Sequence, residues 1–131
     1  MKRRAQKADC IVVPKEADEQ RTLIEWATLQ SGKYPELKLL FAIPNGEFRH
    51  MSTGKALKAM GVKAGVPDIC LPVARGIYHG LYVELKRQKN SRTSDEQEGW
   101  LDALSRQGYL AIVCKGWHEA SEVIMQYLRR E

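Results

Sequence analysis

Two short apolar stretches decide how this chain folds: residues 66–73 (VPDICLPV) and residues 80–86 (GLYVELK). Both are typical of buried strands, because β-branched and aromatic residues dominate them and Gly or Pro bounds them. Charged side chains are rare in buried strands unless they are paired or hold a metal ion. Asp68, Glu84 and Lys86, which lie inside these stretches, are therefore candidates for a functional site.

The spacing of the two stretches predicts a hairpin whose loop is centred near Gly76. Gly76 lies midway between Asp68 and Glu84, so this pairing places the two acids directly opposite each other. Side chains alternate along a strand, so Glu84 and Lys86 share a face while Leu85 points away. Directly opposed residues have Cβ atoms roughly 4.5–5.5 Å apart, and like charges at that separation repel.

Two ionised carboxylates this close need a cation between them, or one of them must take up a proton. A divalent ion held by oxygen atoms would meet the first need, and Lys86 beside it could position a water or stabilise a developing negative charge. Spacing alone also fits a plainer interpretation. In that interpretation Lys86 forms an ion pair with either acid on an exposed strand face.

The length and composition are those of one ordinary globular domain. The chain has 131 residues, enough to bury a hydrophobic core, and we expect a loose arm over residues 1–13 and a single domain over 14–131. The 21 Lys and Arg residues against 16 Asp and Glu residues leave a net charge of +5. This favours a polyanionic partner, although many basic proteins bind none. The sequence contains no run of about 18 apolar residues, so we expect no membrane span.

The three cysteines, Cys10, Cys70 and Cys114, are odd in number, far apart, and without the spacing of a zinc site. Cys70 and Cys114 fall in apolar runs, where packing in the core is the expected role. We therefore expect a reduced, cytoplasmic chain.

The rest of the chain predicts helices and strands in alternation. A capping box, Ser94 with Gln97, opens one of the helices. The expected helices span residues 14–32, 53–60, 95–107 and 118–129, and the expected strands beyond the two charged ones span 37–43 and 109–114. The order α-β-α-β-β-α-β-α predicts an α/β protein with a short mixed sheet and helices on both faces.

Several of these motifs together resemble the virus-type replication-repair nuclease (VRR-NUC) family of the PD-(D/E)XK nuclease superfamily. The resemblance covers roughly residues 16–128, and it implies an α-β-β-β-α-β core in which the helix over 53–60 is an insert. It is carried by residues 65–69 (GVPDI), residues 81–86 (LYVELK), Ser94 to Gln97 with Trp100-Leu101 following, and Gly108-Tyr109. Small standalone members of the family occur in bacteriophages and prophages.

The resemblance also implies roles for individual residues. Asp68 and Glu84 match the metal-binding acids, Lys86 matches the lysine beside the attacking water, and Gln97 matches a glutamine that opens the helix after the third core strand. The implied metal is Mg²⁺ or Mn²⁺, to which the backbone carbonyl of Leu85 could add an oxygen, and no organic cofactor is implied. Gln97 could equally be only the return half of its capping box.

The family has a further glutamate in its first helix, with a glutamine four residues later. Glu16 and Gln20 fit this spacing, but Glu19 lies one helical turn away on nearly the same face and is a close rival. Either acid could instead only favour the positive end of the helix dipole.

Basic residues around the predicted site are candidate contacts to DNA phosphates. They are Arg49, Lys55, Lys58, Lys63, Arg87, Lys89 and Arg92, and the family's Pro-Asn-Gly stretch adds Asn45. A scattered basic surface that serves solubility is the alternative. No base-reading element is evident, so we expect recognition of DNA shape.

The resemblance implies a homodimeric endonuclease that cuts branched DNA such as four-way (Holliday) junctions, in the host cytoplasm if the chain is phage-encoded. A two-fold dimer would suit the symmetric cuts of such a branch, with the apolar face of the first or last helix as its interface. Two alternatives remain: a restriction-type endonuclease, and a non-catalytic nucleic-acid-binding module on the same fold.

Overall fold

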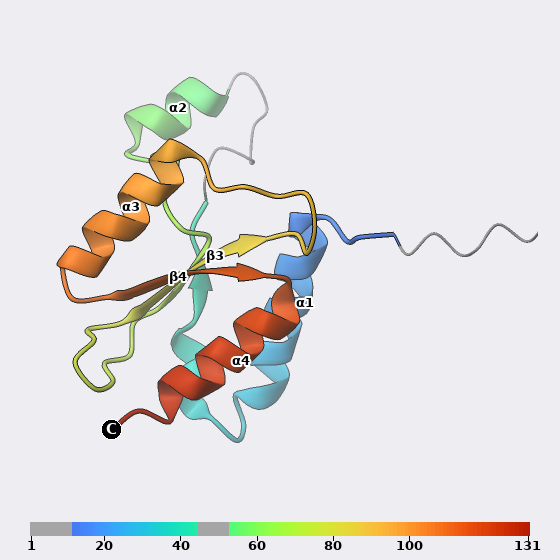
Figure 1. The fold of residues 1–131 in the computed structure, drawn as a ribbon, viewed down its shortest axis with the longest axis vertical. Helices are drawn as coiled ribbons and strands as arrows, with labels where there is room; N and C mark the ends of the chain where they lie inside the picture. Colours follow the sequence, from blue (N-terminus) through green and yellow to red (C-terminus); the bar gives the residue numbers. More distant parts are fainter. Residues whose placement is uncertain (1–11, 45–52) are drawn as a thin grey trace, which may run out of the picture.

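A four-stranded mixed sheet with helices on both sides organises the chain (Figure 1). The structure, a computed structural model, describes residues 12–44 and 53–131. Its elements, in order, are α1 (Glu16–Gln30), the 3-10 helix η1 (Pro35–Leu39), β1 (Phe41–Ala42), α2 (Thr53–Ala59), β2 (Ile69–Leu71), β3 (Leu81–Lys86), α3 (Asp95–Arg106), β4 (Leu110–Lys115) and α4 (Trp117–Leu128). The strand order is β1-β2-β3-β4, with only β3 and β4 parallel. The predicted fold class is confirmed.

The two faces of the sheet have different tasks. Leu81, Val83 and Leu85 of β3 point into a buried core that α1 and α4 cover together. The alternate residues of β3 point to the opposite face, against which α3 packs (Figure 1). This separation leaves one sheet face for stability and the other for a polar site.

The predicted hairpin register is confirmed. Ile69 pairs with Val83, Cys70 with Tyr82 and Leu71 with Leu81, so one further step sets Asp68 opposite Glu84. A slip of one residue would turn the buried side chains of one strand away from the core, which is why the register is strongly specified. The strand expected over 66–73 is shorter than predicted, because Pro67 and Pro72 have no N–H to donate to a ladder.

The strand predicted over residues 37–43 is confirmed only in part. Residues 37–39 belong to η1, and only Phe41 and Ala42 pair as a strand at the edge of the sheet. Pro35 occupies the first turn, and the N–H groups of Leu37 and Leu40 donate to carbonyls three residues earlier. Only Leu37 of the run is buried, so its apolar residues did not mark a buried strand.

Two further predictions, the capping box and the buried cysteines, are confirmed. Helix α3 opens with the predicted capping box at Ser94 and Gln97. Cys70 and Cys114 are buried free thiols. Most of the predicted arm falls outside the described residues, and none of the helices within them is long and apolar enough to cross a membrane.

The loop before β2 rests directly on the first turn of α3. Gly65 has φ +88, and a Cβ built on it would lie 2.7 Å from the carbonyl carbon of Glu96. Both the backbone conformation and the contact require glycine here. This contact brings the segment that carries Asp68 against the helix that carries Gln97.

Gly65→Ala should lower the free energy of unfolding by about 2 kcal/mol or more, because the side chain meets backbone atoms and a left-handed conformation. Gly99→Ala is the matched control, since Gly99 lies within α3 and its Cβ would meet nothing within 4 Å. That change should raise stability by about 0.5–1 kcal/mol. Urea denaturation measures both, and equal effects of the two changes would contradict the packing described.

Candidate active site

Asp68 and Glu84 meet on the sheet face opposite the main core. Asp68 immediately precedes β2 and is half-buried, whereas Glu84 lies within β3 and is 1% exposed. The backbone N–H of Leu85 donates to Asp68 Oδ2 at 2.8 Å. This hydrogen bond attaches the Asp68 carboxylate to β3, beside Glu84.

Lys86 completes the predicted set. Its side chain is buried, and its Nζ lies 3.6 Å from Glu84 Oε1 and 3.8 Å from Glu16 Oε1. The same Nζ donates a hydrogen bond to Gln97 Oε1 at 2.8 Å. A buried ammonium is stable only when its charge is compensated, and these three acceptors supply that compensation for Lys86.

Gln97 serves the helix cap and the site at once. Its backbone N–H donates to Ser94 Oγ at 3.2 Å, and its Oε1 accepts from the Ser94 N–H at 2.9 Å. Its Nε2 also donates to Glu84 Oε1 at 2.9 Å. Both Ser94 and Lys86 donate to Oε1, so the amide has one favourable orientation. The capping-box interpretation of Gln97 is confirmed, and the same side chain also contacts Glu84 and Lys86.

The Glu84 carboxyl is in an unfavourable environment for its charge. Burial first, and then the neighbouring Asp68 carboxylate, raise its pKa to about 8, although Lys86 opposes the shift. Its Oε2 is buried and has no hydrogen-bond partner among residues 12–44 and 53–131. A buried oxygen without a donor, next to a second carboxylate, fits a cation.

The donor set indicates what kind of cation would fit. Asp68 and Glu84 offer only oxygen atoms, which suit a hard ion such as Mg²⁺ or Mn²⁺. The part of the chain that the structure describes holds no cluster of three or more His, Cys, Asp or Glu side chains suited to a metal. Mg²⁺ needs few protein ligands because it keeps several waters, so two carboxylates are sufficient.

The structure separates Glu16 from Glu19. Glu16 is the first residue of α1, is partly exposed and faces Lys86. Glu19 is 1% exposed and turns to α4, where its Oε2 accepts the N–H of Trp117 and its Oε1 accepts Gln88 Nε2 at 3.1 Å. Glu19 thus satisfies the N-terminus of α4, and Glu16 is the α1 acid at the site.

The predicted DNA-contacting residues form two groups around the site. The predicted contacts on or after α2, beside the start of α3, are exposed (Figure 1). Two predicted contacts in the connection between β3 and α3 are exposed as well, and this connection passes above the end of β3 in the same view. The first group is Lys55, Lys58 and Lys63, and the second is Lys89 and Arg92. Asn45 and Arg49 lie outside the described residues.

Arg87 differs from the other predicted contacts. It is half-buried, and its Nη2 donates to the carbonyl of Val13 at 3.2 Å. Its Nε is buried without a hydrogen-bond partner in the described part of the chain. Arg87 therefore joins the segment before α1 to the end of β3, a role that its position in a polar loop did not indicate.

Lys115, a basic residue near the site, is not among the residues predicted from the sequence. Lys115 ends β4 and pairs with Lys86. The available signal was a charged residue at the end of an apolar strand, the same signal that marks Lys86.

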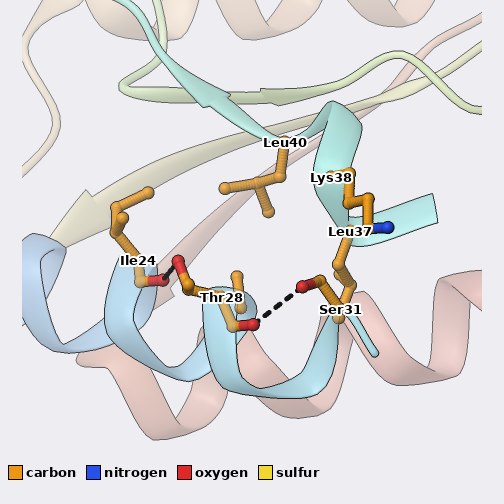
Figure 2. A pocket seen from close by; sticks show the side chains of 7 residues that line it. Ile24, Thr28, Ser31, Leu37, Lys38 and Leu40 are labelled. Atoms are coloured by element: carbon orange, nitrogen blue, oxygen red, sulfur yellow. Dashed lines mark hydrogen bonds between the residues drawn. The ribbon is translucent and has the colours of Figure 1, made fainter. Parts of the chain in front are cut away.

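A groove lies between α1 and η1, and none of the acids of the site lines it (Figure 2). Its lining combines apolar and polar side chains, and its hydroxyls are used locally: Thr28 donates to the carbonyl of Ile24 at 2.9 Å, and Ser31 donates to that of Thr28 at 2.7 Å. The lining residues are Ile24, Ala27, Thr28, Ser31, Leu37, Lys38 and Leu40. No convergent polar groups mark this groove as a catalytic site.

Comparisons with known proteins agree with this geometry. A family model, the VRR-NUC domain, matches residues 12–118. A solved structure described as a VRR_NUC domain protein is 33% identical, covers 90% of this chain and 91% of its own, and superposes with a TM-score of 0.77. Comparison with curated proteins finds no match. The family match over most of the chain, the PD-(D/E)XK-like architecture and the similarity to a solved member show that this chain belongs to the VRR-NUC family of virus-type replication-repair nucleases.

Proposed function

We propose that this nuclease is a metal-dependent deoxyribonuclease that hydrolyses phosphodiester bonds in branched DNA, with Mg²⁺ or Mn²⁺ bound by Asp68 and Glu84. One observation carries the proposal: two carboxylates and a compensated lysine converge on one sheet face, and the buried Glu84 Oε2 lacks a partner among the described residues. Such a set favours a bound cation, because without one of these ions one of the two carboxyl groups must take up a proton.

The chemistry follows from the resistance of a phosphodiester, whose negative charge repels nucleophiles. A bound divalent ion would neutralise the phosphate and lower the pKa of an attacking water. Asp68 and Glu84 would bind that ion, with the carbonyl of Leu85 as a further oxygen. Lys86 would orient the water or stabilise the charge that develops on the phosphate.

Two neighbours would keep these groups in place. Gln97 binds Glu84 Oε1 and Lys86 together, which leaves Glu84 Oε2 available for a cation. Glu16, near Lys86, would hold the ammonium in position or accept a proton from the attacking water. Substrate binding would rest on phosphate contacts from the exposed lysines of α2 and from Lys89 and Arg92, which give affinity without reading bases.

The proposals of a branched DNA substrate and of a two-fold dimer rest on the family resemblance. The apolar faces of α1 and α4, expected as possible interfaces, are used inside the chain: Leu23, Ala27, Ile124 and Tyr127 are all buried in it. A dimer would need other apolar surface. The exposed side chains of Leu29, Leu39 and Phe41 supply some.

Asp68→Asn and Lys86→Met should each reduce cleavage of labelled four-way DNA by at least about 100-fold in Mg²⁺ or Mn²⁺, since each removes a group that acts on the transition state. Lys38→Met, on the far groove, should leave cleavage unchanged. Mn²⁺ should raise the thermal midpoint of the wild type and not that of Asp68→Asn. Circular dichroism confirms that each variant is folded.

The panel of substrates also decides between the alternatives. Linear and flapped DNA are incubated with the protein alongside the four-way DNA, with and without EDTA. Sequence-dependent cuts in plain duplex would indicate a restriction-type enzyme, and tight binding without cleavage in any metal would indicate a binding module. An active Lys86→Met protein would remove that lysine from the mechanism.

Glu16→Gln and Glu19→Gln should have opposite consequences. Glu16→Gln should lower the cleavage rate by about 10-fold or more with little change in stability, because the residue is partly exposed and faces Lys86. Glu19→Gln should lower the free energy of unfolding by about 1–3 kcal/mol, because an amide cannot accept both hydrogen bonds that the carboxylate accepts. Cleavage rates and urea denaturation of both variants test this, and a reversed pattern would refute the assignment.

Light scattering coupled to size exclusion should find twice the mass of one chain at micromolar concentration. Phe41→Asp should shift the protein to the mass of a single chain if the exposed apolar surface near β1 forms the interface. A wild type that has the mass of one chain at all concentrations would exclude the dimer.

A further inference from the structure

Lys115 projects to the same sheet face as the candidate active site. Strands β3 and β4 are parallel and in register from Leu81 with Leu110 to Lys86 with Lys115. Residues paired in this way point to the same face. Cys114, the residue before, is fully buried on the core face. Lys115 must therefore point the other way, beside Lys86 and on the face of Glu84.

The backbone around Lys115 is held firmly. Three consecutive N–H groups have acceptors on different elements: that of Lys115 donates to Glu119 Oε2, that of Gly116 to the carbonyl of Lys86 at 2.8 Å, and that of Trp117 to Glu19 Oε2. Gly116 has φ +86, and a Cβ there would lie 3.1 Å from Glu19 Oε2. The Cα of Lys115 is thereby fixed, and only its side chain remains free to adjust.

The two paired lysines have different electrostatic environments. Lys86 is buried and compensated by Glu84, Glu16 and Gln97. Lys115 is exposed, and its ammonium has no ion-pair partner within the described ranges. The nearest acid along the chain, Glu119, uses an oxygen on the Lys115 backbone instead. An uncompensated ammonium at the rim of such a site attracts phosphate.

We propose that Lys115 contacts a backbone phosphate of the bound DNA at the β4 side of the site, next to the phosphate on which Lys86 acts. This inference rests on the proposed nuclease function and adds a phosphate contact on β4 to those proposed for the lysines of α2. The contact would supply affinity and position the strand, and it would take no part in bond cleavage.

The test measures DNA binding in the full-length Asp68→Asn protein, which should bind without cutting. Lys115→Ala, Lys115→Arg and the remote control Lys38→Ala are compared with four-way DNA at several salt concentrations. Lys115→Ala should raise Kd by about 3–10-fold and reduce the slope of log Kd against log salt by about 0.9, as expected for one lost phosphate contact. Lys115→Arg should retain binding, and Lys38→Ala should leave Kd unchanged.

In the cleaving protein, Lys115→Ala should raise KM with kcat within about twofold of the wild type. The inference is overturned if Lys115→Ala and Lys38→Ala have the same Kd and salt slope. It is equally overturned if Lys115→Arg is as weak as Lys115→Ala, or if kcat falls at constant KM. A wild type that neither binds nor cuts DNA would overturn the nuclease proposal itself, an outcome distinct from these.

Discussion

The antiparallel pairing of β2 with β3 is the constraint on which the rest of the structure depends. It sets Asp68 opposite Glu84 and, by the alternation of side chains, brings Lys86 to the same face. The same register turns Leu81, Val83 and Leu85 into the core under α1 and α4. The apolar side chains that stabilise this register therefore also hold together carboxylates that would otherwise repel each other.

Stability and function oppose each other at Glu84. A carboxylate that is 1% exposed and lies beside another acid destabilises the fold, and the same environment raises its pKa. The compensation is partial: Lys86 supplies a positive charge, and Gln97 supplies one donor, while Oε2 has no partner in the described residues. Such a conflict is typical of functional sites, where the scaffold tolerates an unfavourable group that a ligand later stabilises.

Helix α1 connects this site to the rest of the molecule through two acids one turn apart. Glu16 turns to Lys86, whereas Glu19 binds the N–H of Trp117 and the side chain of Gln88. The hydrogen bond from the Trp117 N–H to Glu19 holds the start of α4 where β4 ends, beside Lys115. Lys86 inside the site and Lys115 at its rim therefore lie where the ends of β3 and β4 meet α1 and α4.

Local pattern was sufficient for most elements and for the centre of the site. The β-rich composition of two bounded stretches, their symmetric spacing about Gly76 and the capping box at Ser94 depend on neighbours in the chain, so they could be interpreted without a structure. In the stretch over 37–43 only Phe41 and Ala42 form a strand, because apolar residues alone do not distinguish a strand from a 3-10 turn, and the packing of Leu37 decides between them.

The sequence by itself determined the order of the elements, the hairpin register and the acids and lysine that converge. The tertiary structure alone decided that Glu16 and not Glu19 faces the site, that Gln97 joins the helix cap to the acids, and that Lys115 lies beside Lys86. The physical reason is range. Alternation, turn chemistry and capping act over a few residues, whereas these three placements depend on how α1, α3 and β4 pack against β3 from distant parts of the chain.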